Sequence, residues 1–407
     1  MAKLLSPADL KELAENPMQI AFFGAGAIAE KTSEKYNVKP DFVVDNNKDT
    51  QGSSILGVKV LSPQELFNNS ISISVVICST SIDQINAQLL TLGVAAKNIY
   101  ISPKLKEYNT ISDFEKISFD LLFTSGLQDQ TPIDEIGGGG LYRVKGSFDN
   151  FQVSKISAGA SHGMRVVDGF IYVVNEQYGI AKYNKKLELI DSYYLPDNLR
   201  PHGIDYCPSL QQWALACSMG DCVLLLNNQF SEIGRIDLSN MRHSYAGSPQ
   251  HHTNDLCIIG NHLYVSMFSI SGNWKRNIFD GGVHVYNLIS KERAMTLYGN
   301  LRMPHNVSCY EDQLWILDSL RKKLYRGNDL FLSNMLSFSR GLDFSSNLNL
   351  IFIGQSKNRN FSNLHTDQLE ATSLDTAITV VRQDPLLSRN IILPSSISEI
   401  HSIVSLK

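Results

Sequence analysis

Five histidines and one arginine recur along the chain in short segments that resemble one another. The segments are ASHGMRV, RPHGIDY, HHTNDLC, MPHNVSC, FSRGLDF and EIHSIVS, and their shared position holds His162, His202, His252, His305, Arg340 and His401. Half of the 10 histidines therefore occupy five of six equivalent positions. Neutral imidazoles gathered in one pocket suit zinc, manganese or iron. The pattern predicts a divalent transition metal held by some of these five histidines.

Residues near the histidines add groups for anion binding and proton transfer. Arg340 replaces imidazole in the fifth segment, and its planar guanidinium suits a carboxylate or phosphate. Asp255, or a histidine such as His401, would move a proton, so Arg340, Asp255 and His401 are candidate catalytic residues. Nearby polar side chains would orient the imidazoles: Asp205, Asn254, Asp255, Asn306 and Asp343. The alternative is that all these side chains only hydrogen-bond neighbouring strands.

The elements that would position these residues follow from the surrounding pattern. From about residue 118, short strands separated by turn residues replace helical periodicity, and further strands follow each of the first five segments. Such a repeat is typical of a β-propeller. The sixth segment lacks its later strands, which LLFTSGLQ, GGLYRVKG and NFQVSKI near residue 120 supply. We therefore predict a six-bladed propeller over residues 118–407, closed by pairing of its N- and C-terminal strands.

The predicted propeller explains why the repeated position matters. The innermost strand of every blade runs along the central channel, so equivalent positions lie at about one height around one axis. Five imidazoles far apart in the sequence would converge there. The insertion SISGNWKRNIFDGG, residues 269–282, would be either a lid over one mouth of the channel or an ordinary exposed loop.

Residues 1–110 have a different pattern, in which strands alternate with helices. This predicts a small Rossmann-like domain of about four parallel strands, and an α/β plus all-β class for the whole chain. Gly24 and Gly26, with Ala29, form a G-x-G-x-x-A turn, and Asp45 follows about 20 residues later. Backbone amides at such a turn bind phosphate, so Gly24, Gly26 and Asp45 are candidate nucleotide-binding residues. Alternatively, the glycines only permit close packing of helix and sheet.

Two resemblances add to this interpretation. FFGAGAIAE, DFVVDNN and VVICSTSIDQINAQLLTLGV resemble the Rossmann-like modules of bacterial nucleotide-sugar-modifying enzymes, which implies a nucleotide or nucleotide-sugar ligand. RPHGID, MPHN with DQLWILDS, and SRGLDF with IFIGQSK resemble an uncharacterised bacterial propeller family, which implies the fold but no activity. The arrangement is more distantly similar to propeller lyases and lactonases that hold a divalent metal in the channel, and this resemblance transfers only the location of a site.

Composition excludes several classes of partner. The formal charge of -4 and the absence of a basic run argue against nucleic acid. No stretch is apolar enough for a signal peptide or a membrane span. The six cysteines form no CxxC pair, which suits reduced thiols in a cytoplasmic protein. A homo-oligomer is compatible with the sequence.

The function that fits these features best is a metal-dependent enzyme of the lyase, hydrolase or epimerase type. It would act on a sugar or nucleotide-sugar in bacterial glycan or secondary metabolism, with its active site in the propeller channel. One alternative is a non-catalytic binding or assembly protein with a nucleotide-sensing domain. A further alternative is an NAD-dependent oxidoreductase.

Overall fold

The structure is a computed structural model that describes residues 2–67, 73–126, 132–175, 179–196, 199–239, 250–357 and 373–406. The chain forms two compact units, Met1–Lys116 and Ile117–Lys407. Within the described ranges, no helix has the length and apolar character needed to cross a membrane.

The first unit is built on a mixed, mainly parallel sheet with helices. Its strands follow the order β1-β7-β6-β2-β3-β5-β4, and only β4 and β5 pair in antiparallel fashion. The strands are β1 (Lys3–Leu4), β2 (Gln19–Phe23), β3 (Phe42–Val44), β4 (Ser54–Ile55), β5 (Val58–Leu61), β6 (Ile73–Ile77) and β7 (Ile99–Ile101). The helices are α1 (Pro7–Glu15), α2 (Ala27–Tyr36), α3 (Pro63–Phe67), α4 (Ile82–Thr91), η1 (Ala96–Asn98), η2 (Pro103–Leu105) and α5 (Lys106–Glu115).

Alternation of side chains along β2 gives this sheet a core on each face. Ile20 and Phe22 pack with residues of α1 and α2, whereas Ala21 and Phe23 pack with residues of α3 and α4. Both faces are therefore covered by helices, as parallel sheets require. The parallel strands expected from the sequence are β2, β3, β6 and β7, and the short strands β1, β4 and β5 extend the sheet.

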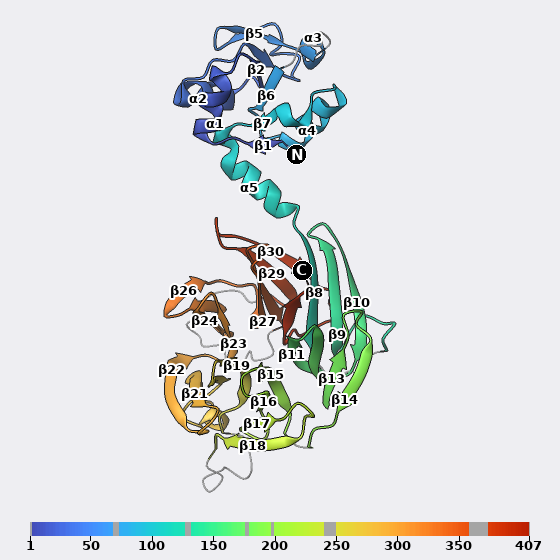
Figure 1. Ribbon diagram of the computed structural model, residues 1–407, viewed down its shortest axis with the longest axis vertical. Coiled ribbons are helices and arrows are strands. Elements are labelled where there is room, and N and C mark those ends of the chain that lie inside the picture. The colour runs from blue at the N-terminus through green and yellow to red at the C-terminus, as the bar shows by residue number, and fades with distance from the viewer. Residues whose placement is uncertain are drawn as a thin grey trace. The chain divides into compact units, whose positions relative to one another are not determined.

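The second unit consists of six four-stranded sheets. The first three blades are β11 (Ser161–Val167), β12 (Phe170–Asn175), β13 (Gly179–Tyr183), β14 (Leu189–Tyr193); β15 (Pro201–Cys207), β16 (Gln212–Cys217), β17 (Cys222–Leu226), β18 (Glu232–Asp237); and β19 (Thr253–Ile259), β20 (His262–Met267), β21 (Gly281–Asn287), β22 (Arg293–Leu301). The next two are β23 (Pro304–Tyr310), β24 (Gln313–Asp318), β25 (Lys323–Arg326), β26 (Asp329–Leu332); and β27 (Phe338–Ser345), β28 (Leu350–Ser356), β29 (Ala377–Arg382), β30 (Leu387–Ile392). In Figure 1 the first strand of each blade lies toward the centre of the ring and the fourth toward its rim.

The sixth blade joins the two ends of this unit. It has the order β10-β9-β8-β31, and its strands are β8 (Ser118–Ser125), β9 (Gly140–Ser147), β10 (Asn150–Ala158) and β31 (Ile403–Ser405). β31 pairs with β8, with Ile403 opposite Phe123. The six-bladed propeller and its closure by the terminal strands are thus confirmed. The sequence analysis missed one outer strand, β26, because its four residues carry little pattern.

A bulge follows the start of the inner strand in five blades. The ladder register shifts between Ser161 and Met164, and corresponding shifts occur in β15, β19, β23 and β27. Bulges re-aim side chains, and they commonly lie beside functional sites. Gly163 fits this crowded turn because a Cβ there would stand 2.3 Å from the carbonyl oxygen of His202. The bulges therefore release His162, His202 and Arg340 from regular pairing, whereas His305 still pairs with Leu317.

Within the described residues of the propeller unit there is also one short helix. η4 (Trp274–Arg276) is part of the connection between β20 and β21. This connection is the insertion that the sequence analysis left open as a lid or a loop.

Candidate metal centre

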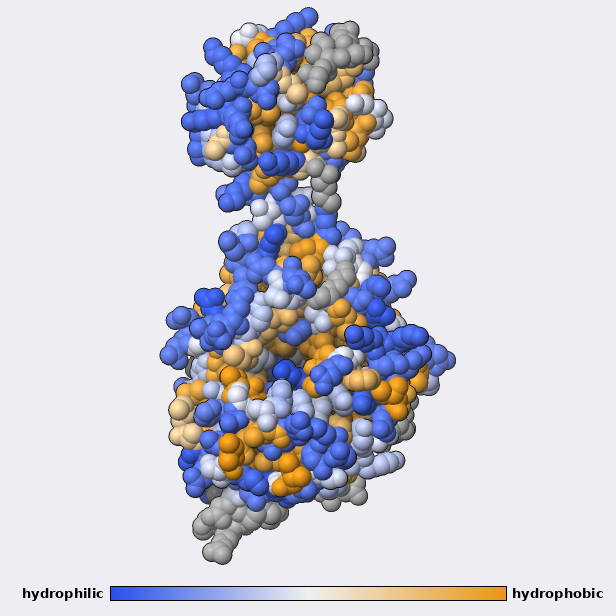
Figure 2. All heavy atoms as spheres, viewed as in Figure 1, coloured by the Kyte–Doolittle hydropathy of each residue, from blue (hydrophilic) through white to orange (hydrophobic). Residues whose placement is uncertain are grey.

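A cavity of about 410 Å³ lies at the end of the channel where the inner strands begin. All six residues at the repeated position line it: His162, His202, His252, His305, Arg340 and His401. On the face seen in Figure 2, the propeller surface is hollowed near the centre of the ring. The structure therefore brings together the side chains that the repeat singled out.

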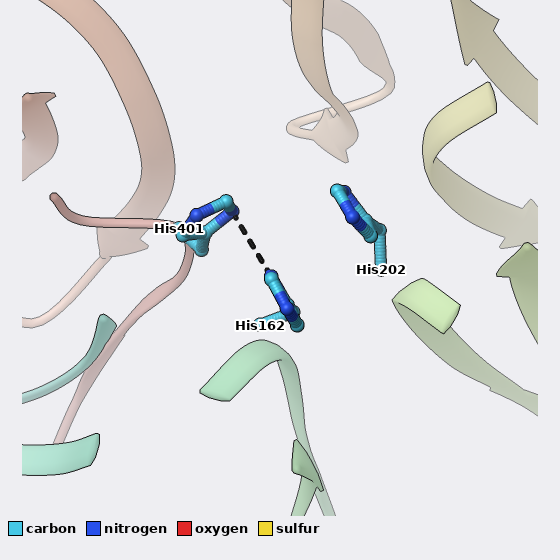
Figure 3. A group of neighbouring side chains, drawn as sticks. All are labelled: His162, His202 and His401. Carbon is cyan, nitrogen blue, oxygen red and sulfur yellow. Dashed lines mark hydrogen bonds between the residues drawn. The ribbon is translucent and has the colours of Figure 1, made fainter. Parts of the chain in front are cut away.

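Three of the histidines lie close enough to share one metal ion. His162, His202 and His401 each offer a ring nitrogen, and these atoms lie within 4.8 Å of one another. Nδ1 of His162 and Nδ1 of His401 are 3.5 Å apart (Figure 3). Two imidazole nitrogens bound to a tetrahedral zinc ion at about 2.05 Å stand about 3.4 Å apart. This pair already has the spacing of metal ligands.

Glu399 orients the His401 ring. Its carboxylate is 2% exposed, and its Oε2 lies 3.3 Å from Nε2 of His401. When Nε2 carries the proton and donates it to Glu399, Nδ1 presents its lone pair toward His162. A carboxylate behind a ligand histidine has this effect in many metal sites. Arg340 Nη1 donates to Oε1 of Glu399 at 3.4 Å and also lies 3.2 Å from Nε2 of His401, to which it can donate only when the His401 proton is on Nδ1.

His202 completes the trio, but its ring has a different orientation. The rings of His162 and His202 are stacked, 4.4 Å apart with 9° between their planes. Because the imidazole lone pair lies in the ring plane, a shared metal requires the His202 ring to rotate about its Cβ–Cγ bond. Its Nε2 is buried and has no hydrogen-bond partner among the described protein atoms. A buried acceptor or donor without a partner is unfavourable, and a ligand at this atom would remove that cost.

His252 lies outside the trio. Its ring packs between Trp274, 4.2 Å away, and Phe268, 4.4 Å away, and is 6.2 Å from the ring of His202. The pairing of the inner strands explains why His252 lies elsewhere. In β15 the first paired residue comes directly before His202, whereas in β19 the first paired residue, Thr253, comes directly after His252. The register thus places Asn254 where the other blades have histidine. The alignment of His252 with the other histidines was wrong by two residues.

His305 is also held apart from the trio. Its Nδ1 lies 3.0 Å from the carbonyl oxygen of Met303 and 2.9 Å from Oγ of Ser319. The five predicted metal ligands therefore reduce to three that converge, with His252 and His305 on other parts of the cavity wall.

Burial keeps four of the cavity histidines neutral, namely His202, His252, His305 and His401. It lowers the pKa values of His202 and His305 well below their usual range, with smaller contributions from neighbouring imidazoles or from Arg340. Burial, reinforced by nearby cations, lowers the pKa values of His252 and His401 to about 3. Neutral imidazole is the form that binds a metal, so no proton has to leave these four side chains at neutral pH.

The polar residues expected to orient the imidazoles have another role. Asp205 accepts a hydrogen bond from the Ile258 amide at 2.8 Å and pairs with Arg165 at 2.7 Å. Asp343 accepts from the Ser405 amide at 2.6 Å. Each contact joins the inner strands of two neighbouring blades. The expectation that Asp205 and Asp343 fix histidine tautomers was wrong, because their carboxylates are used by amides of the next blade.

Asp255 forms a hydrogen bond to the neighbouring blade and also lies near the histidines. Its Oδ2 accepts from the side-chain amide of Asn306, at 2.7 Å, which joins the third and fourth blades. Asp255 also lines a narrow neck of the channel together with His202, His305 and His401. Burial raises its pKa to about 7. Beyond the neck lies a second cavity of about 290 Å³, lined by the later residues of the inner strands.

Two residues of the site carry too weak a signal for sequence analysis. Glu399 stands two residues before His401, and its spacing in EIHSIVS was the only pointer to it. Gly126, which lines the cavity, belongs to no repeat. A Cβ at Gly126 would stand 2.5 Å from His401 Nε2 and 2.7 Å from His162 Cε1, so these rings need a glycine here.

The three nucleotide-binding candidates lie together at one edge of the first sheet. Gly24 has φ of +114°, and a Cβ there would stand 2.8 Å from the carbonyl oxygen of Cys78. Gly26 is the N-cap of α2. Asp45 accepts hydrogen bonds from the amides of Ala25, at 2.6 Å, and Asn47, at 2.8 Å. The Asp45 carboxylate thus fixes the glycine turn itself.

The fold and the site define a six-bladed β-propeller with a histidine-lined channel, preceded by a sheet-and-helix unit. Residues 145–407 match the family described as "Domain of unknown function (DUF4915)", and the chain belongs to this family. Residues 16–100 match the model described as "C2185-like, N-terminal".

Several solved structures are similar to the chain at low sequence identity. The chain is similar to a structure from a nidogen/laminin complex, with TM-score 0.45, 11% identity, and coverage of 70% of this chain and 97% of that one. It is also similar to a protein of unknown function from Bacteroides caccae, with TM-score 0.48, 9% identity and coverage of 71% and 99%. A luciferin-regenerating enzyme gives TM-score 0.39, 11% identity and coverage of 57% and 76%. No curated protein matches the chain significantly.

Proposed function

We propose that this protein is a metal-dependent enzyme whose reaction centre is the trio of His162, His202 and His401. The observation that carries the proposal is that three imidazoles from three blades converge within 4.8 Å in the wall of an open cavity. Catalytic zinc sites commonly use three protein ligands and leave the fourth position for water or substrate. A purely structural site would instead close the coordination sphere with protein.

The surrounding residues favour lyase, hydrolase or epimerase chemistry on a sugar-like substrate. A bound divalent metal would supply Lewis acidity to a carbonyl or hydroxyl oxygen. Glu399 is placed to accept a proton from Nε2 of His401, which would leave Nδ1 available, and the Arg340 guanidinium in the cavity wall suits an anionic group. Asp255, whose pKa is raised to about 7 by burial, is suited to exchange a proton across the neck.

For the first unit we propose a nucleotide or nucleotide-sugar ligand at the Gly24 turn. Counting only β2, β3, β5, β6 and β7, the parallel strands have the order 3-2-1-4-5, which is typical of Rossmann-like folds. The turn follows β2, beside the point where the strand order reverses, and ligands of such folds bind there. Titration of the full chain with UDP-glucose and with NADH separates a nucleotide-sugar site from a cofactor site. Saturable binding of neither compound would contradict this part of the proposal.

Metal binding tests the proposed centre. Chelator-treated protein is titrated with zinc, manganese or iron(II), and its melting temperature is measured. At a metal concentration of 100 times Kd, we expect about 2.7 kcal/mol of stabilisation and a rise in Tm of about 5 °C. His202→Ala should abolish the rise, whereas His262→Ala, at an exposed position on β20, should retain it. An unchanged Tm with all three metals, or an equal rise in His202→Ala, would contradict the proposal.

A further inference from the structure

The cavity beside the trio carries an excess of positive charge. Among its described lining residues, three are cationic and one, Glu399, is acidic; the cations are Arg200, Lys275 and Arg340. Arg340 and Glu399 form an ion pair at 3.4 Å. Arg200 and Lys275 lie in exposed positions at the mouth. A cleft lined with one sign of charge raises the local concentration of ligands with the opposite sign.

The same cations act on His252. Arg200, Arg340 and Lys275 all lower the pKa of this imidazole, although burial is the larger cause. All three side chains also line the same cavity as His252. An anion in this cavity would be attracted by all of them.

An apolar surface adjoins the cations. The connection between β20 and β21 brings Trp274, Lys275 and Phe279 to the cavity. The Trp274 ring packs at a tilt against His252, and Lys275 Nζ lies 4.3 Å from the centre of the Trp274 ring. A ring next to a cation suits a ligand that has both a flat apolar part and a negative charge. The insertion thus forms part of the cavity wall, as the lid interpretation expects.

Asn254 points independently to a bound molecule. The residue is 3% exposed, and its side-chain amide nitrogen donates to the carbonyl oxygen of Pro304 at 3.3 Å. Asn254 is one of the lining residues of the cavity, and its Oδ1 is buried with no hydrogen-bond partner among the described atoms. Buried acceptors are rarely left without a donor. A hydroxyl or N–H group of a ligand would satisfy it.

We infer that the cavity binds an anionic, ring-containing molecule, with its carboxylate or phosphate at Arg200 and Lys275, its ring against Trp274, and a hydroxyl or N–H donating to Asn254. The inference deepens the proposed function and rests on it in one respect, since this molecule is taken as the substrate of the trio. The connection between β20 and β21 then determines substrate specificity.

Intrinsic fluorescence tests the inference, because the chain has three tryptophans and two of them are buried. Trp213 and Trp315 are 3% and 1% exposed, so quenching by a small solute reports on Trp274. Metal-free protein is titrated with phenyl phosphate, benzoate and the neutral benzyl alcohol. We expect saturable quenching by at least one anion. Its affinity should exceed that of benzyl alcohol about tenfold or more, because one hydrogen bond to a charged group changes affinity by about this factor.

Two variants of the β20–β21 connection test whether Lys275 binds the negative charge of the anion. Lys275→Gln should weaken binding of the anion about tenfold. Arg276→Gln makes the same change of charge at a residue outside the cavity lining, and it should bind like the wild type. Equal binding of benzyl alcohol, no saturable quenching by either anion, or an equal loss in Arg276→Gln would overturn the inference. Because anion binding is measured on metal-free protein, it is tested separately from metal binding. A negative result in one experiment therefore leaves the other proposal unaffected.

Discussion

The absence of a side chain at Gly126 allows the rings of His162 and His401 to approach each other closely. Replacing it with alanine places a Cβ 2.5 Å from His401 Nε2, and the rings must turn away. We expect Gly126→Ala to lower metal affinity about tenfold or more while the protein stays folded, since ring ends can move more easily than backbone. Metal competition with a chromophoric chelator measures this. Gly299→Ala is the control, because the nearest atom to its Cβ would be 3.9 Å away. Unchanged affinity in Gly126→Ala would contradict the assigned geometry.

Glu399 provides a second residue-scale prediction. Glu399→Gln retains the size of the side chain but removes the negative charge that favours a proton on His401 Nε2. Changes of this kind behind a ligand histidine commonly reduce metal affinity about 10- to 100-fold. We expect a loss in that range, with an unchanged far-ultraviolet circular dichroism spectrum. If Glu399→Gln bound metal like the wild type, Glu399 would serve only as a partner of Arg340.

The residue scale also shows what the sequence could not supply. The repeat found the histidines because each lies near the start of an inner strand. It could not separate the trio from His252 and His305, because the difference depends on the bulges and on ring packing. Asp255 has its partner Asn306 51 residues away, so its contact between blades leaves no local pattern.

At the scale of elements, Asp343 links β27 to the closing strand β31. Burial raises its pKa to about 6, against its usual value of 3.8, and outweighs the opposing effects of Arg165 and two backbone amides. Between these values the folded protein binds a proton that the unfolded chain has released. This contribution to stability is therefore full at low pH and is lost as the pH rises from about 4 to about 6.

Asp343→Asn should remove that dependence, because the side-chain carbonyl still accepts from the Ser405 amide and cannot ionise. We expect the free energy of unfolding of Asp343→Asn, relative to wild type, to increase as the pH rises from 4 to 6, as measured by urea denaturation. Asp343→Ala leaves the Ser405 amide without its acceptor and should lose about 1–3 kcal/mol. A difference between Asn variant and wild type that is constant with pH would show that Asp343 does not titrate in this range.

The elements themselves were easier to predict than their details. Segments such as RPHGIDY and MPHNVSC recur with turn residues between them, and this periodicity identified the inner strands of five blades. The incomplete last repeat at His401 identified the closing strand. Short strands such as β26 and β5 escaped, because four residues of a strand carry almost no alternation.

At the scale of the whole molecule, closure of the ring assembles the centre. His162 and His202 belong to the first two blades, while His401 stands next to β31, which pairs with β8 to complete the sixth blade. The trio therefore forms only when the two ends of the propeller region meet. A metal bound at the trio would therefore favour the closed ring over any open form and would stabilise it.

Crystallographic detection of the metal in the channel tests this account most directly. Diffraction data collected on either side of the absorption edge of the bound metal yield an element-specific map. We predict one strong peak at about 2.0–2.2 Å from a nitrogen of each of His162, His202 and His401, with the His202 ring rotated out of its stack on His162. No peak at the trio in crystals grown with excess zinc, manganese or iron would contradict the central claim.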